Sequence, residues 1–191
     1  MRLALVMMAL VLGSHAAWAA DPAAGEATAK ACTGCHGAQG ISAIPTVPSL
    51  AGQKDNFLQW QLVFFRSGRR ANPIMGPISA NLTDEELRNL GAYYASLPGP
   101  AARPAPDPTA LQPGAEIAAE HHCAACHTDS FMGNRAAPAV AHQQRDYLAK
   151  ALSDYRSSAR PSVGVAAMTE AASGLSDTDI AALADYLATF P

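Results

Sequence analysis

Two five-residue stretches, Cys32-Thr33-Gly34-Cys35-His36 and Cys123-Ala124-Ala125-Cys126-His127, are the most informative part of this chain. Each places two thiols about one helical turn apart, so that both can add to the two vinyl groups on one edge of a porphyrin. The histidine that follows is positioned to ligate the iron beneath that edge. We therefore expect two covalent c-type haems. Attachment is expected through Cys32, Cys35, Cys123 and Cys126, with His36 and His127 as axial ligands.

Other uses of paired cysteines fit this pattern less well. A structural zinc site has two Cys-x-x-Cys pairs separated by roughly 15 to 20 residues, whereas these pairs begin 91 residues apart. A thioredoxin-like redox pair requires βαβ surroundings, and no strand pattern is visible. All four cysteines lie inside the two motifs, which leaves none for a structural disulfide.

The similarity of the two halves extends well beyond these motifs, as an internal duplication predicts. At an offset of 90 residues, Pro48, Gln53, Leu58, Phe65, Arg66 and Arg70 correspond to Pro138, Gln143, Leu148, Tyr155, Arg156 and Arg160. After a three-residue insertion in the second copy, Met75, Leu82, Asp84, Leu90, Tyr93 and Pro98 correspond to Met168, Leu175, Asp177, Leu183, Tyr186 and Pro191.

The amino terminus predicts an export signal. Residues 3–12 are uninterruptedly apolar and Ala17-Trp18-Ala19 offers small residues for a signal peptidase, so we predict a signal peptide over residues 1–19. A membrane anchor is the alternative, but ten apolar residues fall short of the roughly 20 that span a bilayer. We expect a periplasmic protein with no integral membrane segment after cleavage.

A proline-rich stretch over residues 98–108 separates the copies and predicts an extended spacer. We therefore expect an N-terminal domain over residues 20–98, a linker over 99–112 and a C-terminal domain over 113–191. Domains of about 80 residues have a marginal core. A buried haem would stabilise each one.

Apolar residues recur at helical spacing in both copies, and the predicted fold is all-α. We predict helices over residues 22–36, 114–127, 57–67 and 147–157. A last helix in each copy begins at a capping box, Thr83 to Glu86 and the weaker Ser176 to Asp179, and ends before a proline. The expected architecture is two tandem domains that each enclose one covalent haem.

Met75 and Met168 are the candidates for the opposite axial ligands, because they occupy matching positions in the two copies. A thioether is a soft ligand for ferrous iron, and His/Met ligation raises the reduction potential. An isolated methionine is usually a core residue, but the matched register favours ligation. Met132 lies too close to His127 to reach the far face of the porphyrin, and His142 competes for the second iron without a counterpart in the first copy.

Two further sets of residues are expected around the haems. Pro48 and Pro138 each offer a carbonyl that can accept the ring N–H of the preceding axial histidine, with an ordinary turn proline as the alternative. Buried haem propionates need cations or hydrogen-bond donors, and four arginines could supply them. The alternative is that these arginines lie on a solvated helix face. The candidates, which are the basic residues shared by both copies between the haem motif and the methionine, are Arg66, Arg156, Arg70 and Arg160.

The charge of the chain limits its partners. Residues 20–191 carry 16 acidic and 12 basic residues, a formal charge of −4, and no basic patch that would indicate nucleic acid. Ionised propionates would make the loaded protein more acidic still, so a partner guided by charge should be basic where it docks.

The residues resemble class I cytochromes c, and in particular the dihaem cytochrome c4 family, over nearly the whole chain after the signal peptide. The resemblance rests on Cys-x-x-Cys-His-Gly, Pro48-Ser49-Leu50-Ala51-Gly52-Gln53, Phe65-Arg66-Ser67-Gly68-Arg69-Arg70, Met75-Gly76-Pro77-Ile78, Leu82-Thr83-Asp84-Glu85-Glu86 and Tyr93-Tyr94. It implies two cytochrome c folds packed about a pseudo-twofold axis, His/Met ligation at both irons, and periplasmic electron delivery, often towards a terminal oxidase. The second copy departs from this pattern at Thr128, where glycine is expected, and at His142.

Three functions remain open at this point. The first is a non-enzymatic carrier of single electrons between redox proteins, since each copy provides both axial ligands. The second is the cytochrome subunit of a flavin-containing dehydrogenase, such as one that oxidises sulfide. The third is a dihaem peroxidase, which would need an open or easily vacated iron position.

Overall fold

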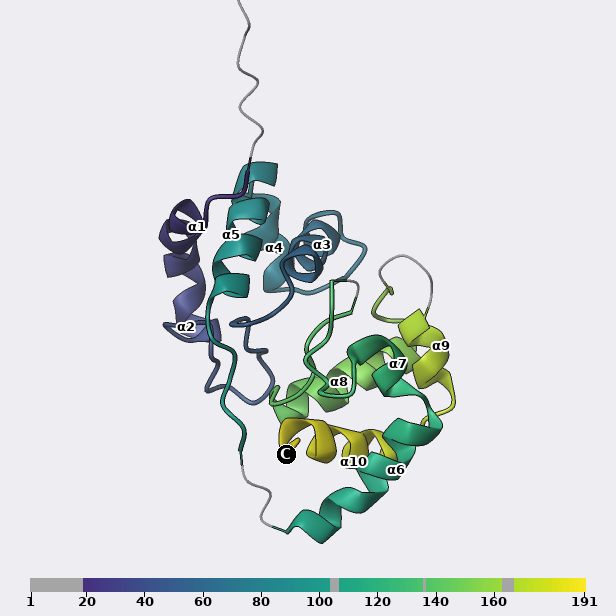
Figure 1. Ribbon diagram of the computed structural model, residues 1–191. Helices are drawn as coiled ribbons and strands as arrows, with labels where there is room; N and C mark the ends of the chain where they lie inside the picture. The colour runs from purple at the N-terminus through teal and green to yellow at the C-terminus, as the bar shows by residue number, and fades with distance from the viewer. Residues whose placement is uncertain (1–18, 104–106, 136, 163–166) are drawn as a thin grey trace, which may run out of the picture.

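The computed structural model describes residues 19–103, 107–135, 137–162 and 167–191, and these residues form helices with no strand (Figure 1). The predicted signal peptide, apart from Ala19, and residues 104–106 of the predicted linker lie outside the described residues. The first half contains α1 (Pro22–Ala29), η1 (Lys30–Cys32), α2 (Thr33–His36), α3 (Asp55–Arg66), α4 (Met75–Ala80) and α5 (Asp84–Ser96). The second contains η2 (Pro108–Leu111), α6 (Gln112–Glu120), α7 (Cys123–His127), α8 (Arg145–Arg156), α9 (Ala167–Ser173) and α10 (Asp177–Ala188).

The two halves repeat one packing scheme around separate cores. In the first half α1 and α3 pack on α5, and α4 packs on α3. In the second, α6 and α8 pack on α10, and α9 packs on α8. The first core is built around Leu58, Leu90 and Tyr94, and the second around Leu148 and Leu183 with their neighbours. The predicted all-α duplication is therefore confirmed.

A glycine allows the first and last helices of each half to cross at close range. A Cβ atom on Gly25 would lie 2.1 Å from the Asn89 carbonyl oxygen of α5, and one on Gly114 would lie 2.3 Å from the Ala182 carbonyl oxygen of α10. Any larger residue would force the helices apart, because backbone atoms cannot yield. The crossing fixes where each haem motif leaves its first helix.

The last helices begin where the sequence predicts. The Thr83 hydroxyl accepts from the Glu86 N–H while the Glu86 carboxylate accepts from the Thr83 N–H. Ser176 and Asp179 form the same reciprocal pair. Both capping boxes are therefore present, and each satisfies two amide donors that the first helical turn would otherwise leave free.

The helices that lead to the haem motifs are less regular than the sequence suggests. The first is interrupted by the 3₁₀ turn η1. The second breaks between α6 and α7, where His122 adopts a left-handed conformation with φ of 52°. Relative to the crossing glycines, the second copy has two more residues before its first cysteine, and the break accommodates them.

Four turns have a positive φ in both copies, and the first copy has glycine at each of these positions whereas the second does not. Non-glycine residues adopt a positive φ at these sites, which strains the backbone because Cβ crowds the neighbouring carbonyl. The pairs are Gly37 and Thr128, Gly40 and Phe131, Gly52 and His142, and Gly68 and Ser158. The turns are thus set by the shared fold rather than by local residue preference.

Replacing Ser158 by glycine should raise the free energy of unfolding by about 1 kcal/mol, because glycine removes the strain of a φ of 60° at this exposed turn. Ser157→Gly is the matched control, because Ser157 has an ordinary negative φ of −82° at the end of α8, where glycine should lower the free energy of unfolding. Urea unfolding followed by circular dichroism measures both. Equal losses for the two variants would contradict the assignment of strain to Ser158.

Candidate haem sites

Cys32 is the last residue of η1 and Cys35 lies in α2, whereas Cys123 and Cys126 both lie in α7, and all four are free of disulfides. Cys32 and Cys123 are half-buried, whereas Cys35 and Cys126 are exposed. Burial raises the pKa of the Cys32 and Cys123 thiols, so both stay protonated near neutral pH. Within the described residues, no three His, Cys, Asp or Glu side chains gather in a way that could hold a metal ion directly. The raised pKa of these thiols differs from the lowered pKa of reactive cysteines in dithiol redox motifs.

The two motif histidines are held in the same way. The ring Nδ1 of His36 donates to the Pro48 carbonyl at 2.8 Å, and that of His127 donates to the Pro138 carbonyl at 2.8 Å. Both rings are 7% exposed. Burial lowers the pKa of each imidazole, although the proline carbonyl partly opposes it, and the neutral form is favoured. A neutral ring with Nδ1 engaged presents Nε2 as a ligand for iron.

The two methionines lie at the starts of corresponding short helices that the sequence did not predict. Met75 is the first residue of α4, where the Asn72 side chain accepts from the Ile74 and Met75 N–H groups at 2.9 and 2.8 Å. Met168 is the second residue of α9 and packs against the second core. Both side chains are half-buried. The duplication therefore places them on equivalent elements.

Large apolar side chains are exposed on either side of the candidate ligands. Ile41 and Ile44 follow the first haem motif and are 41% and 40% exposed. Ile74 and Ile78 flank Met75 and are 63% and 45% exposed. A porphyrin covers apolar surface of this kind, and the residues present fit a haem.

Arg66 and Arg156 form hydrogen bonds with the start of the last helix in each half. Arg66 donates to the Leu82 carbonyl at 3.0 Å and to Asp84 at 2.6 Å. Arg156 makes the same two contacts, with the Leu175 carbonyl at 2.8 Å and Asp177 at 2.5 Å. These guanidinium groups are engaged within their own domain and are not on a freely solvated helix face.

Arg70 and Arg160 instead converge at the junction of the two halves. Both donate to the Gln61 side-chain oxygen, at 2.6 and 2.9 Å, and Arg160 also donates to the Tyr147 hydroxyl at 3.2 Å. Each stacks on an equivalent ring, Arg70 on Phe65 and Arg160 on Tyr155.

This arginine pair brings two positive charges close together at the domain junction. Among the described residues neither arginine forms an ion pair, and Arg160 is 3% exposed. Although burial raises the pKa of Tyr147, the charges of Arg160 and Arg70 lower it to about 8. The buried Arg160 Nε and Gln61 Nε2 have no partner. Carboxylates such as haem propionates are the groups that such donors fit.

His142 occupies a position that needs glycine only in the first half. A Cβ on Gly52 would lie 2.8 Å from the linker residue Gly99. In the second half, the His142 ring donates from Nε2 to the Phe190 carbonyl at 3.0 Å. This contact ties the ring to the end of the C-terminal domain.

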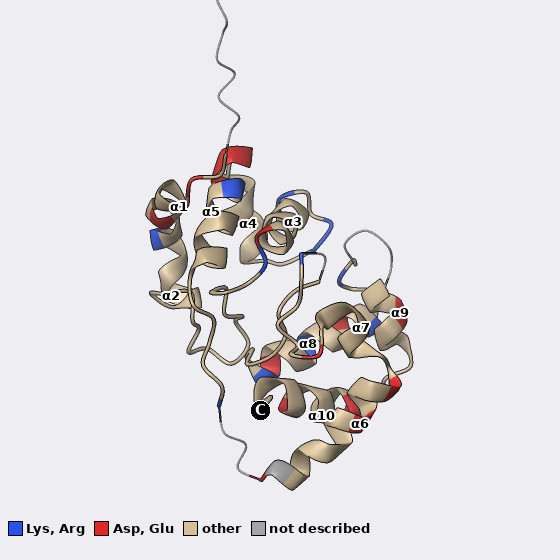
Figure 2. Cartoon of the chain, viewed as in Figure 1, with Lys and Arg blue, Asp and Glu red and all other residues tan. Residues whose placement is uncertain are grey.

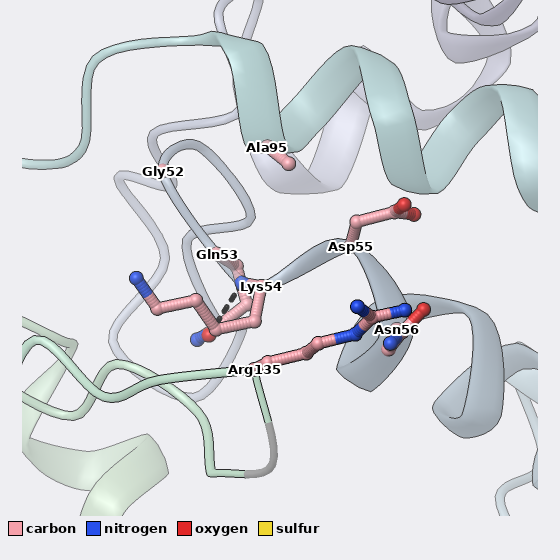
Figure 3. A pocket seen from close by; sticks show the side chains of 7 residues that line it. All are labelled: Gly52, Gln53, Lys54, Asp55, Asn56, Ala95 and Arg135. Carbon is pink, nitrogen blue, oxygen red and sulfur yellow. Dashed lines mark hydrogen bonds between the residues drawn. The ribbon is translucent and has the colours of Figure 1, made fainter. Parts of the chain in front are cut away.

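A surface hollow at the domain junction is lined by Gly52, Gln53, Lys54, Asp55, Asn56, Ala95 and Arg135 (Figure 3). The Arg135 side chain comes from the second half and reaches towards Asn56 of α3 in this view. None of the haem-motif residues or the two methionines lines it. The hollow is therefore separate from the candidate haem sites.

Comparison with known proteins assigns both halves. Residues 20–93 match the family model described as cytochrome c oxidase, cbb3-type, subunit III, and residues 111–191 match that described as cytochrome c. The chain is 36% identical to cytochrome c4 of Pseudomonas aeruginosa, with 96% of each chain covered. The chain belongs to the cytochrome c4 family.

Two further comparisons bear on this cytochrome c4. Reduced recombinant cytochrome c4 from Pseudomonas stutzeri superposes with a TM-score of 0.82 at 30% identity, covering 90% of this chain and 99% of that one. A protein of Stutzerimonas stutzeri named thiosulfate dehydrogenase electron acceptor is 35% identical, over 73% of this chain and 68% of its own. The chain is thus a dihaem electron-transfer protein with two covalent c-type haems.

The contacts of Arg66 predict how it contributes to this cytochrome c4. Arg66→Met should lower the free energy of unfolding by about 1–2 kcal/mol, because the Leu82 carbonyl loses its partner. Asp84→Asn should cost only about 0.5 kcal/mol, since Asp84 is 74% exposed. Denaturant unfolding measures both changes. Neither variant should move a reduction potential, and a shift in Arg66→Met alone would assign Arg66 to a propionate.

Proposed function

We propose that this protein is a periplasmic carrier that passes single electrons between respiratory partners, with His36 and Met75 ligating one iron and His127 and Met168 the other. The observation that carries the proposal is the matched pair of ligand sets. Each half holds a buried neutral histidine on a proline carbonyl and presents a methionine on an equivalent helix. With both axial positions filled from the chain, no iron position is left for a substrate.

The residues of the chain favour rapid electron exchange. The haem iron supplies the one-electron chemistry. The rings of His36 and His127 are held by carbonyl groups in a packed interior, and the Met75 backbone N–H donates to the Asn72 side chain. Groups that are fixed in this way do not have to rearrange when the charge on the iron changes.

The junction arginines complete the proposed site. Arg70 and Arg160 would neutralise propionates that face the domain junction, and Gln61 Nε2 would donate to the same carboxylates. Arg66 and Arg156 hold the last helix of each domain instead.

Charge and export determine which partners the carrier meets. The net charge of residues 20–191 favours partners that are basic where they dock, a membrane oxidase among them. Acidic residues mark α6 and the start of α5, whereas basic residues mark the loop after α3 (Figure 2). No helix in the described part of the chain is long and apolar enough to cross a membrane. Export through residues 1–19 would deliver the protein to the periplasm.

A second function is favoured by one comparison. The relative named thiosulfate dehydrogenase electron acceptor favours a role in which this chain accepts electrons from a dehydrogenase, either as a free protein or as its subunit. This alternative function uses the same two haem sites as the free carrier and differs from it only in the protein partner. A flavin-containing sulfide dehydrogenase would use the chain in the same way, whereas a peroxidase would need one methionine to leave its iron.

Substitution of the methionines tests the ligand sets. Met75→Ala and Met168→Ala should each remove about half of the methionine-to-ferric-iron charge-transfer band and lower one reduction potential, because the thioether stabilises ferrous iron. Met132→Ala is the matched control and should leave the band intact. Retention of the full band in both ligand variants would refute the assignment.

Carbon monoxide separates a carrier from a peroxidase. The ferrous wild-type protein should not bind carbon monoxide rapidly at neutral pH, because both axial positions are filled. Each methionine variant should bind about one equivalent. Stoichiometric binding at one haem of the wild-type protein would favour the peroxidase. Sedimentation of protein purified at native abundance separates the other two functions, since a stable complex with a dehydrogenase subunit would exclude the free carrier.

A further inference from the structure

Two glutamines, Gln53 in the first domain and Gln143 in the second, each bind a backbone residue of the opposite domain. Gln143 Oε1 accepts from the Ser49 N–H at 2.8 Å, and its Nε2 donates to the Ser49 carbonyl at 2.9 Å. Gln53 binds the Ala139 N–H and carbonyl in the same way, at 2.8 and 2.9 Å. Both glutamines are 6% exposed. We call these two contacts the glutamine clamps.

The orientation of each clamp is determined by its partners. Gln53 Oε1 also accepts from the Lys54 N–H at 2.9 Å, and Gln143 Oε1 accepts from the Gln144 N–H at 2.9 Å. Backbone N–H groups can only donate and carbonyl groups can only accept, so the amide oxygen and nitrogen cannot be exchanged. Each amide therefore makes three hydrogen bonds in a buried setting.

The clamped peptide groups are the same ones that hold the axial histidines. The Ser49 N–H belongs to the peptide group whose carbonyl, that of Pro48, accepts from His36. The Ala139 N–H belongs to the peptide group whose carbonyl, that of Pro138, accepts from His127. A continuous chain of two hydrogen bonds thus leads from each histidine to a glutamine of the other domain.

Hydrogen bonds in such a chain strengthen one another. Donation from the N–H side of a peptide group polarises it and makes its carbonyl a better acceptor. A better acceptor draws the Nδ1 proton of the histidine more strongly and raises the basicity of the ring as a ligand. A more basic ligand stabilises ferric iron and lowers the reduction potential, since hydrogen bonding to the ligand is one of the levers that tunes it.

We propose that Gln143 tunes the haem of the N-terminal domain and Gln53 tunes the haem of the C-terminal domain, each through the proline peptide that holds the opposite axial histidine. The proposal rests on the ligand roles of His36 and His127 given above. Gln53 and Gln143 are positioning residues, and they touch no ligand directly. The reduction potential of each haem then depends on the domains being docked.

The matched control is Gln144, which crosses the same junction without touching a proline peptide. Its side-chain nitrogen donates to the Ser42 carbonyl, and its oxygen accepts from Arg103. Gln144→Leu therefore weakens the domain contact but leaves both clamps in place. Any effect of a loosened junction in general appears in this variant.

The test uses the full-length protein with both haems, as wild type and as Gln143→Leu, Gln53→Leu and Gln144→Leu. Proton NMR of the ferrous protein follows the Nδ1–H resonances of His36 and His127, and spectroelectrochemistry follows the two potentials. Gln143→Leu should move the His36 resonance upfield and raise the potential of the N-terminal haem. Gln53→Leu should do the same for His127 and the C-terminal haem, and Gln144→Leu should do neither.

The crossed pattern is the decisive readout, because a merely structural role would not produce it. Shifts confined to the haem of the substituted domain, equal shifts at both haems, or shifts equal to those of Gln144→Leu would overturn the proposal. If one variant fails to fold, the other still gives a crossed or an uncrossed result. Failure of the ligand assignment itself is distinct, because the wild-type charge-transfer band would then be missing.

Discussion

The peptide group between a proline and the next residue is where cofactor binding and domain packing meet in this protein. Its carbonyl accepts a hydrogen bond from the ring of a buried haem-motif histidine, and its N–H donates to the side-chain amide oxygen of a glutamine in the other domain. A proline fits here because it supplies a carbonyl and has no N–H of its own that would need a partner. The loop around each haem and the contact between the domains therefore cannot be changed independently.

Much of this could be predicted from the sequence, for reasons that particular residues illustrate. The haem motifs and capping boxes are local patterns, in which each residue's partner lies within a few positions along the chain. The contact of His36 with Pro48 was predicted because the ring N–H needs an acceptor and because a proline follows the motif histidine in both copies, by 12 and 11 residues. The short helices α4 and α9 were not predicted, because α4 has six residues and α9 seven, which is too few to show an apolar periodicity.

The contacts between the domains were not predicted from the sequence. Gln53 and Gln143 are visible as a matched pair, but nothing local shows that each binds across the junction. The four matched arginines likewise look alike in the sequence, yet Arg66 and Arg156 hold helix starts while Arg70 and Arg160 converge on Gln61. The difference arises from which side chains the opposite domain brings near, which is a property of the assembled fold.

The two halves share one backbone fold, but the side chains and interdomain contacts around their haem motifs differ. His142 adopts a positive φ, and its ring donates a hydrogen bond to the Phe190 carbonyl. At the corresponding position, Gly52 lets the linker residue Gly99 pack closely against the backbone. Across the junction, Gln144 and the Tyr147 N–H add contacts to Ser42 and Pro45, which lie in the loop around the first haem. Lys54, which corresponds to Gln144, makes no side-chain hydrogen bond across the junction within the described part of the chain. The loop of the first haem is thus held by more contacts from its neighbour, and the two proposed ligand sets lie in unequal surroundings. With the proposed His/Met ligation at both irons, such a difference in surroundings would give the two haems different reduction potentials and would favour electron transfer in one direction between them.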